Sequence, residues 1–136
     1  MIVKKNARNL VVVSRWFVLK VPRDGNVRRI FKEFCLTWKA FLHGLAPPVI
    51  IIGPVLIRAP VKLLKDVAYD SKALDEIEGA IKKLAELGIE HRELRHPERH
   101  VGLWRGRWVF IDFDHGRLSR RSRDLNKFRA WRRAIT

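Results

Sequence analysis

Acidic side chains in the last third of the chain have the types and spacing that a phosphate site needs. His91-Arg92-Glu93 lies in a charged loop, and about twenty residues later a hydrophobic run ends at Asp112-Phe113-Asp114. A loop carboxylate can orient an attacking hydroxyl or accept its proton, and a carboxylate at a strand end can hold Mg²⁺ over the same phosphate. Glu93 and Asp112 therefore predict phosphoryl-transfer chemistry.

Each of these residues also has an ordinary structural interpretation. Glu93 alone fits a charged turn after a helix, and Asp112 fits a turn former at the end of a strand. Asp114 fits a helper to Asp112 or the cap of the next segment. The nearby His96 and His100 raise the question of zinc, but the chain has one cysteine and no paired ligand spacing. A zinc site is therefore disfavoured.

A lysine and a glutamate in the first third of the chain could complete the phosphate site. Lys20 lies in a β-type run, and a strand lysine can neutralise the α- and β-phosphates of ATP. Glu33 lies on the first predicted helix, at the flank of its apolar stripe, from which it could reach Lys20. The alternatives are a solvated lysine on a strand face and an ordinary surface acid.

The elements that would position these two residues are a small sheet and a helix. Residues 10–13 and 16–21 predict two antiparallel strands. Asn26 can cap a helix that ends before Gly44. Its apolar positions follow helical spacing and are Val27, Ile30, Phe31, Phe34, Cys35, Trp38, Phe41 and Leu42. The sequence therefore predicts that Lys20 and Glu33 lie on neighbouring elements.

Further strands and a second helix follow along the chain. Residues 49–52 and 55–58 are rich in β-branched side chains and predict two short strands. Residues 71–87 predict a helix, because apolar residues recur at helical spacing and Gly88 is a natural stop. Residues 102–113 predict a hairpin that turns at Gly106 and delivers Asp112 at its end.

Net charge points to a polyanion as a partner. The formal charge is +15, and from Arg117 onward eight Lys or Arg accompany one acid, Asp124. This basic segment, residues 117–136, predicts either a solvated tail helix or a surface for RNA or ribonucleoprotein. Within it, Arg132 and Arg133 follow Trp131, which is a candidate for stacking on bases.

Cysteine content and hydropathy bear on the cellular location. Cys35 is the only cysteine, so no internal disulfide can form, and we expect a cytoplasmic protein. The most apolar run, residues 44–57, is broken by prolines and glycine and is shorter than the roughly twenty residues of a membrane helix. We therefore expect no membrane partner.

Four motifs in order give the chain a resemblance to the small archaeal predicted serine/threonine protein kinases, which are related to the RIO and KEOPS-type atypical kinases. The motifs are Val18-Leu19-Lys20-Val21, then Glu33 leading to Gly44-Leu45-Ala46-Pro47, then Gly88-Ile89-Glu90-His91-Arg92-Glu93-Leu94 through Pro97 to His100-Val101, and finally Ile111-Asp112-Phe113-Asp114.

The resemblance implies an α+β, reduced protein-kinase-like fold, in which a small antiparallel sheet with one helix faces a short helical lobe. Residues 1–62 would form the N-lobe-like part, and residues 63–136 a truncated C-lobe with the catalytic-type loop and the basic segment. It also implies ATP and Mg²⁺ as cofactors. Lys20 and Glu33 would bind the nucleotide, Asp112 would bind the metal, and Glu93 would be the catalytic carboxylate.

The resemblance leaves two functions open. One is a minimal kinase or ATPase-like protein, and the other is a non-catalytic scaffold that binds RNA. The chain departs from complete kinases because no glycine-rich loop precedes Lys20 and no asparagine follows Glu93 at the spacing of a second metal ligand.

Overall fold

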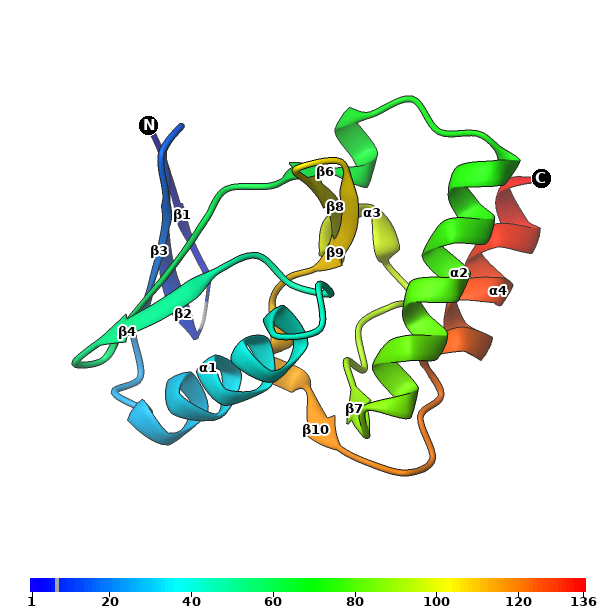
Figure 1. The fold of residues 1–136 in the computed structure, drawn as a ribbon. Coiled ribbons are helices and arrows are strands. Elements are labelled where there is room, and N and C mark those ends of the chain that lie inside the picture. Colours follow the sequence, from blue (N-terminus) through cyan, green and yellow to red (C-terminus); the bar gives the residue numbers. More distant parts are fainter. Residues whose placement is uncertain (7) are drawn as a thin grey trace.

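The computed structural model describes residues 1–6 and 8–136, with a sheet at one side of the molecule and two helices at the other (Figure 1). The elements of the first half are β1 (Ile2–Lys5), β2 (Asn9–Val13), β3 (Val18–Pro22), α1 (Val27–Phe41), β4 (Val49–Ile52) and β5 (Val55–Arg58). Those of the second half are β6 (Lys62–Leu63), the 3₁₀ turn η1 (Leu64–Asp66), α2 (Ser71–Glu86), β7 (Ile89–Glu90), α3 (Pro97–His100), β8 (Val101–Trp104), β9 (Arg107–Phe110), the 3₁₀ turn η2 (Phe113–His115), β10 (Arg117–Leu118) and α4 (Asp124–Ile135). The fold is α+β with antiparallel sheets, as the sequence predicts.

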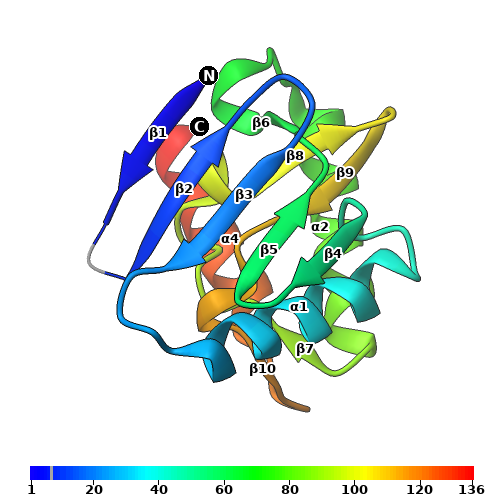
Figure 2. The same ribbon diagram turned by 90° about the vertical axis from the view of Figure 1, so that its left-hand side faces the viewer.

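The large sheet has the strand order β1-β2-β3-β5-β4 (Figure 2). Its strands are dominated by β-branched residues, which pack well on a pleated surface. Lys20 on β3 lies opposite Val11 on β2 and Leu56 on β5. Because side chains alternate along a strand, Lys20 points to the same face as Val18, and both are buried. The strands predicted here are confirmed, although β3 starts later than expected.

Helix α1 has the predicted bounds. The side-chain oxygen of Asn26 accepts a hydrogen bond from the backbone N–H of Arg29 at 3.1 Å. Gly44 follows the helix with φ 73°, a left-handed conformation that glycine adopts without strain.

The buried side of α1 differs from the predicted apolar stripe. The helix buries Ile30, Glu33, Leu36, Thr37 and Ala40. Much of the predicted stripe is exposed instead, namely Val27, Phe31, Cys35, Trp38 and Leu42. The physical reason is that the Glu33 side faces the sheet, where Lys20 lies. Only part of the apolar stripe therefore enters the core, and Glu33 at its flank is buried.

The predicted second helix and the hairpin are both confirmed. Helix α2 buries a stripe formed by Leu74, Ile77, Ile81 and Leu84. The hairpin of β8 and β9 turns at Arg105 and Gly106, both with positive φ. Strand β6 pairs with β8 very closely, since a Cβ on Gly102 would come within 2.8 Å of the Lys62 carbonyl oxygen.

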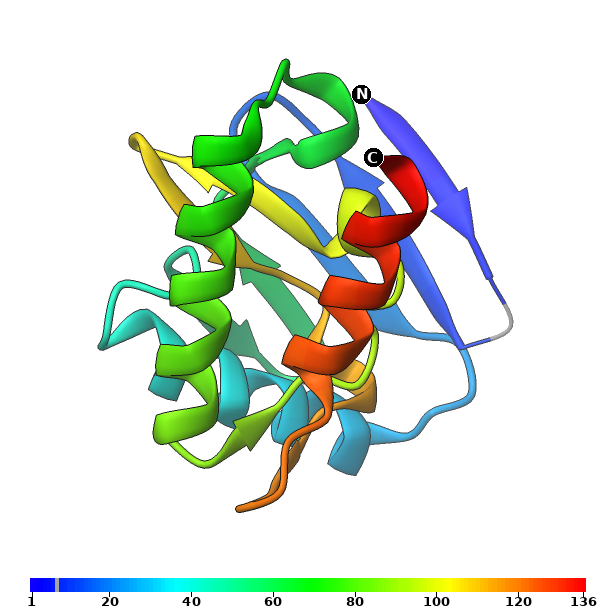
Figure 3. The ribbon, with the colours of Figure 1, turned by 90° about the vertical axis from the view of Figure 1, so that its right-hand side faces the viewer.

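The basic C-terminal segment contains α4, which packs beside α2 (Figure 3). Phe128 of α4 is fully buried in the main core cluster, and Leu125 and Trp131 pack against that cluster. Arg132 is held by Asp75 and Glu78 of α2, at 2.8 and 3.2 Å. Within this segment α4 is therefore a docked helix and not a solvated one, and Trp131, the candidate for base stacking, packs against the core.

No helix within residues 1–6 and 8–136 combines the length and the hydropathy needed to cross a membrane.

Candidate functional site

Three charged side chains from distant parts of the chain meet behind the large sheet. The Lys20 ammonium lies 2.8 Å from Glu33 Oε2 on α1 and 3.1 Å from Asp112 Oδ1 just after β9. Lys20 and Glu33 are almost completely buried, whereas the Asp112 side chain is 31% exposed. The structure thus brings together three of the four residues that the sequence singled out, with Asp112 at the solvent side.

Electrostatic coupling keeps Lys20 and Asp112 charged. Burial alone would lower the pKa of Lys20, but Asp112 and Glu33 raise it above its usual value. Burial would raise the pKa of Asp112, but Lys20 and Arg58 lower it. For Glu33, burial prevails over the attraction of Lys20 and raises the pKa. Lys20 is therefore protonated and Asp112 ionised at neutral pH.

The backbone at Asp112 is shaped to present its carboxylate. Asp112 has φ 60° and ψ 61°, a left-handed conformation that is uncommon outside glycine, asparagine and aspartate. Before it, the N–H of Ile111 donates to the carbonyl of His100 at 3.0 Å. After it, Phe113 is fully buried. Asp112 is thus fixed between two anchored neighbours.

The predicted catalytic-type loop is tied to the same strand end by His91. This fully buried ring contacts the Ile111 carbonyl through Nε2 at 2.6 Å, and its Nδ1 accepts from the N–H of Glu93 at 3.2 Å. Since Nδ1 accepts, Nε2 carries the proton and donates to Ile111. Burial lowers the pKa of His91, which favours this neutral form.

Asp124 at the start of α4 holds the other side of the loop. Its two carboxylate oxygens accept the backbone N–H groups of His91, at 2.7 Å, and of Arg92, at 2.9 Å. Arg92 has φ 77°, so the loop makes a left-handed step between these anchors. Asp124 is buried, and its charge-assisted hydrogen bonds fix the loop that carries Glu93.

Glu93 and Asp114 line the same cavity as Lys20 and Asp112. Glu93 is 24% exposed and lies 3.9 Å from the ring of His115. Asp114 lies 3.6 Å from the guanidinium of Arg8. Neither side chain is hydrogen bonded to Lys20, so Glu93 shares a cavity with the cluster without belonging to it.

A cavity of about 620 Å³ connects these groups. Its charged and polar lining comprises Lys4, Asn6, Asn9, Lys20, Arg58, Lys65, Glu93, Arg99, His100, Asp112, Asp114 and His115. Its apolar lining comprises Val11, Val13, Val18, Pro60, Val61, Leu63 and Ile111. This volume is in the range of small-molecule and cofactor sites. The lining therefore combines aliphatic side chains with several cations.

The residues at the cavity fit a Mg²⁺ ion that is shared with phosphates. Mg²⁺ in nucleotide sites usually takes one or two carboxylates and completes its shell with phosphate oxygens and water. Asp112 Oδ1 is bound to Lys20, whereas the ion pair of Oδ2 within residues 1–6 and 8–136 is with His100 Nδ1, at 3.8 Å. No group of three or more His, Cys, Asp or Glu side chains among the described residues is placed to hold a metal alone.

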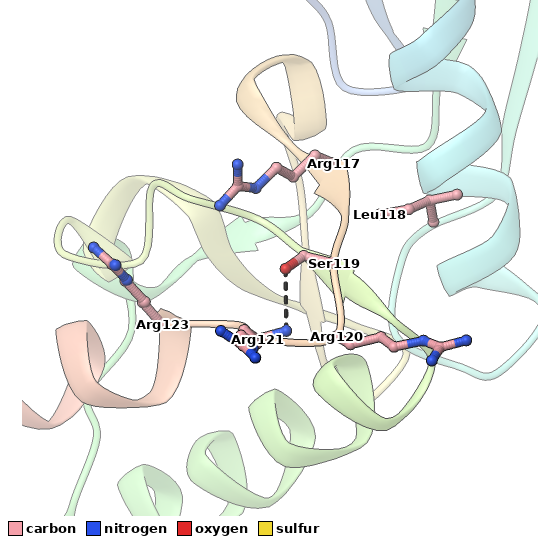
Figure 4. Close-up of a pocket in the computed structure, with 6 residues that line it drawn as sticks. All are labelled: Arg117, Leu118, Ser119, Arg120, Arg121 and Arg123. Atoms are coloured by element: carbon pink, nitrogen blue, oxygen red, sulfur yellow. Dashed lines mark hydrogen bonds between the residues drawn. The ribbon is translucent and has the colours of Figure 1, made fainter.

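A second, shallower cavity of about 440 Å³ lies between β10 and α4. It is lined by Arg117, Leu118, Ser119, Arg120, Arg121 and Arg123 (Figure 4). Arg117 binds the buried Glu90 at 2.7 Å. Arg120 points away from the other arginines in the view of Figure 4. Of the arginines here, Arg117 is the one with an ion pair among residues 1–6 and 8–136.

Sequence reasoning missed two residues of the first site, Arg58 and Asp124. Arg58 ends β5, lines the cavity and lowers the pKa of Asp112. The available signal was a cation at the end of an otherwise apolar strand, the pattern that singled out Lys20. Asp124 carried a weaker signal, as the one acid of a basic segment that precedes an apolar helical repeat.

Comparison of the chain with protein-family models and with curated proteins finds no match.

Proposed function

We propose that the chain is a minimal Mg·ATP-dependent serine/threonine kinase or ATPase-like protein with a reduced kinase-like fold, related to the small archaeal predicted kinases that its motifs resemble. The observation that supports this most is the Lys20 ammonium, which lies between Glu33 and Asp112 at the wall of a cavity that Glu93 also lines. A cytoplasmic location agrees with this chemistry and with the single Cys35.

Each residue has a role that follows from its position. Glu33 holds the buried Lys20 in place, and the remaining Lys20 proton can bind a phosphate oxygen of ATP. Asp112 offers its free oxygen to the metal. Bound Mg²⁺ would offset the negative charge of the phosphates during transfer. Glu93 lies across the same cavity, where a carboxylate can orient a hydroxyl or water.

The test is Mg·ATP binding followed by phosphate release or autophosphorylation. We expect the native chain to bind Mg·ATP in isothermal titration, and we expect Asp112→Ala to abolish turnover. Asp66→Ala is the matched control, because Asp66 is exposed on η1 and does not line the cavity. Correctly folded protein that binds no Mg·ATP would contradict the proposal, and so would equal turnover in the native chain and Asp112→Ala.

A second candidate function, RNA binding, is favoured by the arginines of the loop between β10 and α4. Arg129 and Arg132 of α4 are engaged by acids of α2, so this loop is the better-placed part of residues 117–136. Phosphate contacts release counterions, so RNA affinity should fall steeply with salt. Arg120→Ala with Arg121→Ala should lower the salt slope by about one unit per lost contact.

The matched control for RNA binding is the double variant Arg129→Ala with Arg132→Ala. It removes the same charge from arginines that are already paired, so its salt slope should stay close to that of the native chain. A flat salt profile for the native chain would exclude this function.

A further inference from the structure

The face of the large sheet that points away from Lys20 is made of aliphatic side chains. The strand register places one row across all five strands, formed by Val3, Val12, Leu19, Ile57 and Ile50 in spatial order. Successive side chains alternate between the faces, and Lys20 and Leu56 point inward. This row therefore points outward, and we call the surface that it crosses the outer face.

The next row of the outer face has the same character. Leu10 lies opposite Val21, and Ile52 lies opposite Val55. Lys5, on the edge strand β1, is the charged member of this row. An antiparallel sheet with one solvated face usually alternates apolar with polar residues. The outer face departs from that rule across its whole width.

No described element covers the outer face. Figure 2 shows the five strands in front and the helices behind or below them. Val3, Ile50 and Ile52 are 54%, 53% and 61% exposed, and Leu19 and Ile57 are only partly buried. A continuous exposed apolar surface of this kind marks an interaction site in most proteins.

We propose that the outer face is a dimer interface, at which two copies of this chain pack their five-stranded sheets face to face. The partner must be apolar and nearly flat, because the outer face offers almost no charge or hydrogen-bonding group. A second copy of the same face has both properties. Face-to-face packing of aliphatic sheets is the arrangement of β-sandwich cores, with the sheets about 10 Å apart.

The size of the outer face fits this occupant. Five strands spaced about 4.8 Å apart, over about four residues each, give a flat area of roughly 24 by 13 Å. Two such flat faces amount to roughly 620 Å². The accessible surface of the protruding side chains raises the buried area to on the order of 1,000 Å² in total, the smallest area expected of a specific interface. A two-fold axis that lies between the two faces, parallel to the strands, would bring each row against its own copy.

The exposed stripe of α1 is the main competing surface, but it is narrower. It is one helix wide and contains exposed aromatic residues such as Phe31, which is 56% exposed. Phe31 is therefore a matched control for Ile50, since the two side chains are nearly equally exposed and neither is part of the cavity.

The test is sedimentation equilibrium of the full chain and of two lysine variants. We expect a concentration-dependent dimer that Ile50→Lys weakens roughly tenfold or more, because it places a charge within an apolar interface, on the edge strand β4. Phe31→Lys adds the same charge and should leave the dimer unchanged. The dimer should strengthen with salt, because each copy carries a formal charge of +15 and salt screens the repulsion.

Three outcomes would overturn the proposal. One is a chain that stays monomeric at low and high salt at every concentration at which it is soluble. Another is a dimer that Phe31→Lys dissociates and Ile50→Lys does not. The third is a dimer that weakens with salt, since that would indicate an interface held by opposite charges. None of these outcomes depends on nucleotide binding, so the proposed function is tested separately.

Discussion

Lys20 is the residue whose loss should cost the most stability. It is buried against Glu33, whose other carboxylate oxygen, Oε1, has no hydrogen-bond partner among the described residues. Lys20→Met would leave the Glu33 carboxylate buried without a counter-ion. Breaking a buried pair on one side typically costs about 3–5 kcal/mol. We expect a loss of that size in the free energy of unfolding, measured by urea denaturation.

The double variant Lys20→Met with Glu33→Leu is the control for this interpretation. It removes both charges and replaces them with apolar groups, which is often close to neutral for a buried pair. We expect it to recover most of the stability lost in Lys20→Met. If the double variant loses as much stability as Lys20→Met and Glu33→Leu lose together, the ion pair is not the source of the effect.

His100 should make the stability of the fold depend on pH. Burial and the neighbouring His91 lower its pKa from 6.5 to about 4. Above pH 6.5 the ring is neutral in both states, and as the pH falls from 6.5 toward 4 the unfolded chain takes up a proton that the folded chain refuses. Stability is therefore lost over this window, on the order of 3 kcal/mol from this residue.

The measurement is urea denaturation at a series of pH values for the native chain and His100→Gln. The variant should lose less stability than the native chain between pH 6.5 and 4. It should still lose some, because burial also lowers the pKa of His91. If the free energy of unfolding changes equally with pH in the two proteins, His100 titrates normally in the folded chain.

At the residue scale, the sequence predicted the cluster better than its surroundings. Lys20, Glu33 and Asp112 could be found because each has an unusual place on a recognisable element. The burial of Glu33 could not be predicted, because helical periodicity favoured the aromatic side of α1 as the buried side. The ion pair between Glu33 and Lys20 on β3 determines which side of α1 faces the sheet. Arg58 shares the cavity for a reason that only the pairing of β3 with β5 reveals.

At the element scale, helix α4 should hold the loop that carries Glu93 in its ordered conformation. Asp124→Asn would replace one of the two oxygens that accept the N–H groups of His91 and Arg92 with a donor. Hydrogen bonds to a charged acceptor are worth about 1.5–3 kcal/mol each. We expect a loss of about 2–3 kcal/mol in the free energy of unfolding and faster hydrogen exchange of the two amides.

Asp66→Asn is the matched control for this prediction, because Asp66 is exposed and surface substitutions usually change stability by less than about 0.5 kcal/mol. Unchanged exchange at the amides of His91 and Arg92 in Asp124→Asn would show that other contacts hold the loop.

The elements themselves were largely predictable. Strand β4 is a run of β-branched residues, and helix α2 has apolar residues at helical spacing. Both are local properties of the sequence. For α4 the sequence left a solvated helix as one alternative, because its many cations masked a short apolar repeat. Only the tertiary structure shows that Phe128 enters the core and that acids of α2 hold Arg132.

At the scale of the whole molecule, we expect residues 1–62 and 63–136 to unfold together. The division was predicted from the sequence, but the main core cluster contains Leu36 and Ala40 from the first part and Phe110 and Phe113 from the second. A shared core favours one cooperative transition. The fluorescence of Trp38 alone and of Trp108 alone, in variants with the other tryptophans replaced, should give coincident urea transitions.

Two separated transitions would contradict this expectation and would support two independently stable lobes. Far-UV circular dichroism of the same variants is the control, because it reports on all helices at once and should coincide with both fluorescence curves.

The hydrogen bonds that Asp124 accepts from the loop also have a consequence during synthesis. The ribosome makes the chain from residue 1 onward, so the Glu93 loop and Asp112 both emerge before the carboxylate that fixes that loop. Until α4 has been made and has docked, the nascent chain lacks the anchor that gives the loop its shape. The proposed nucleotide site should therefore form late in translation, in one step, when α4 joins the fold.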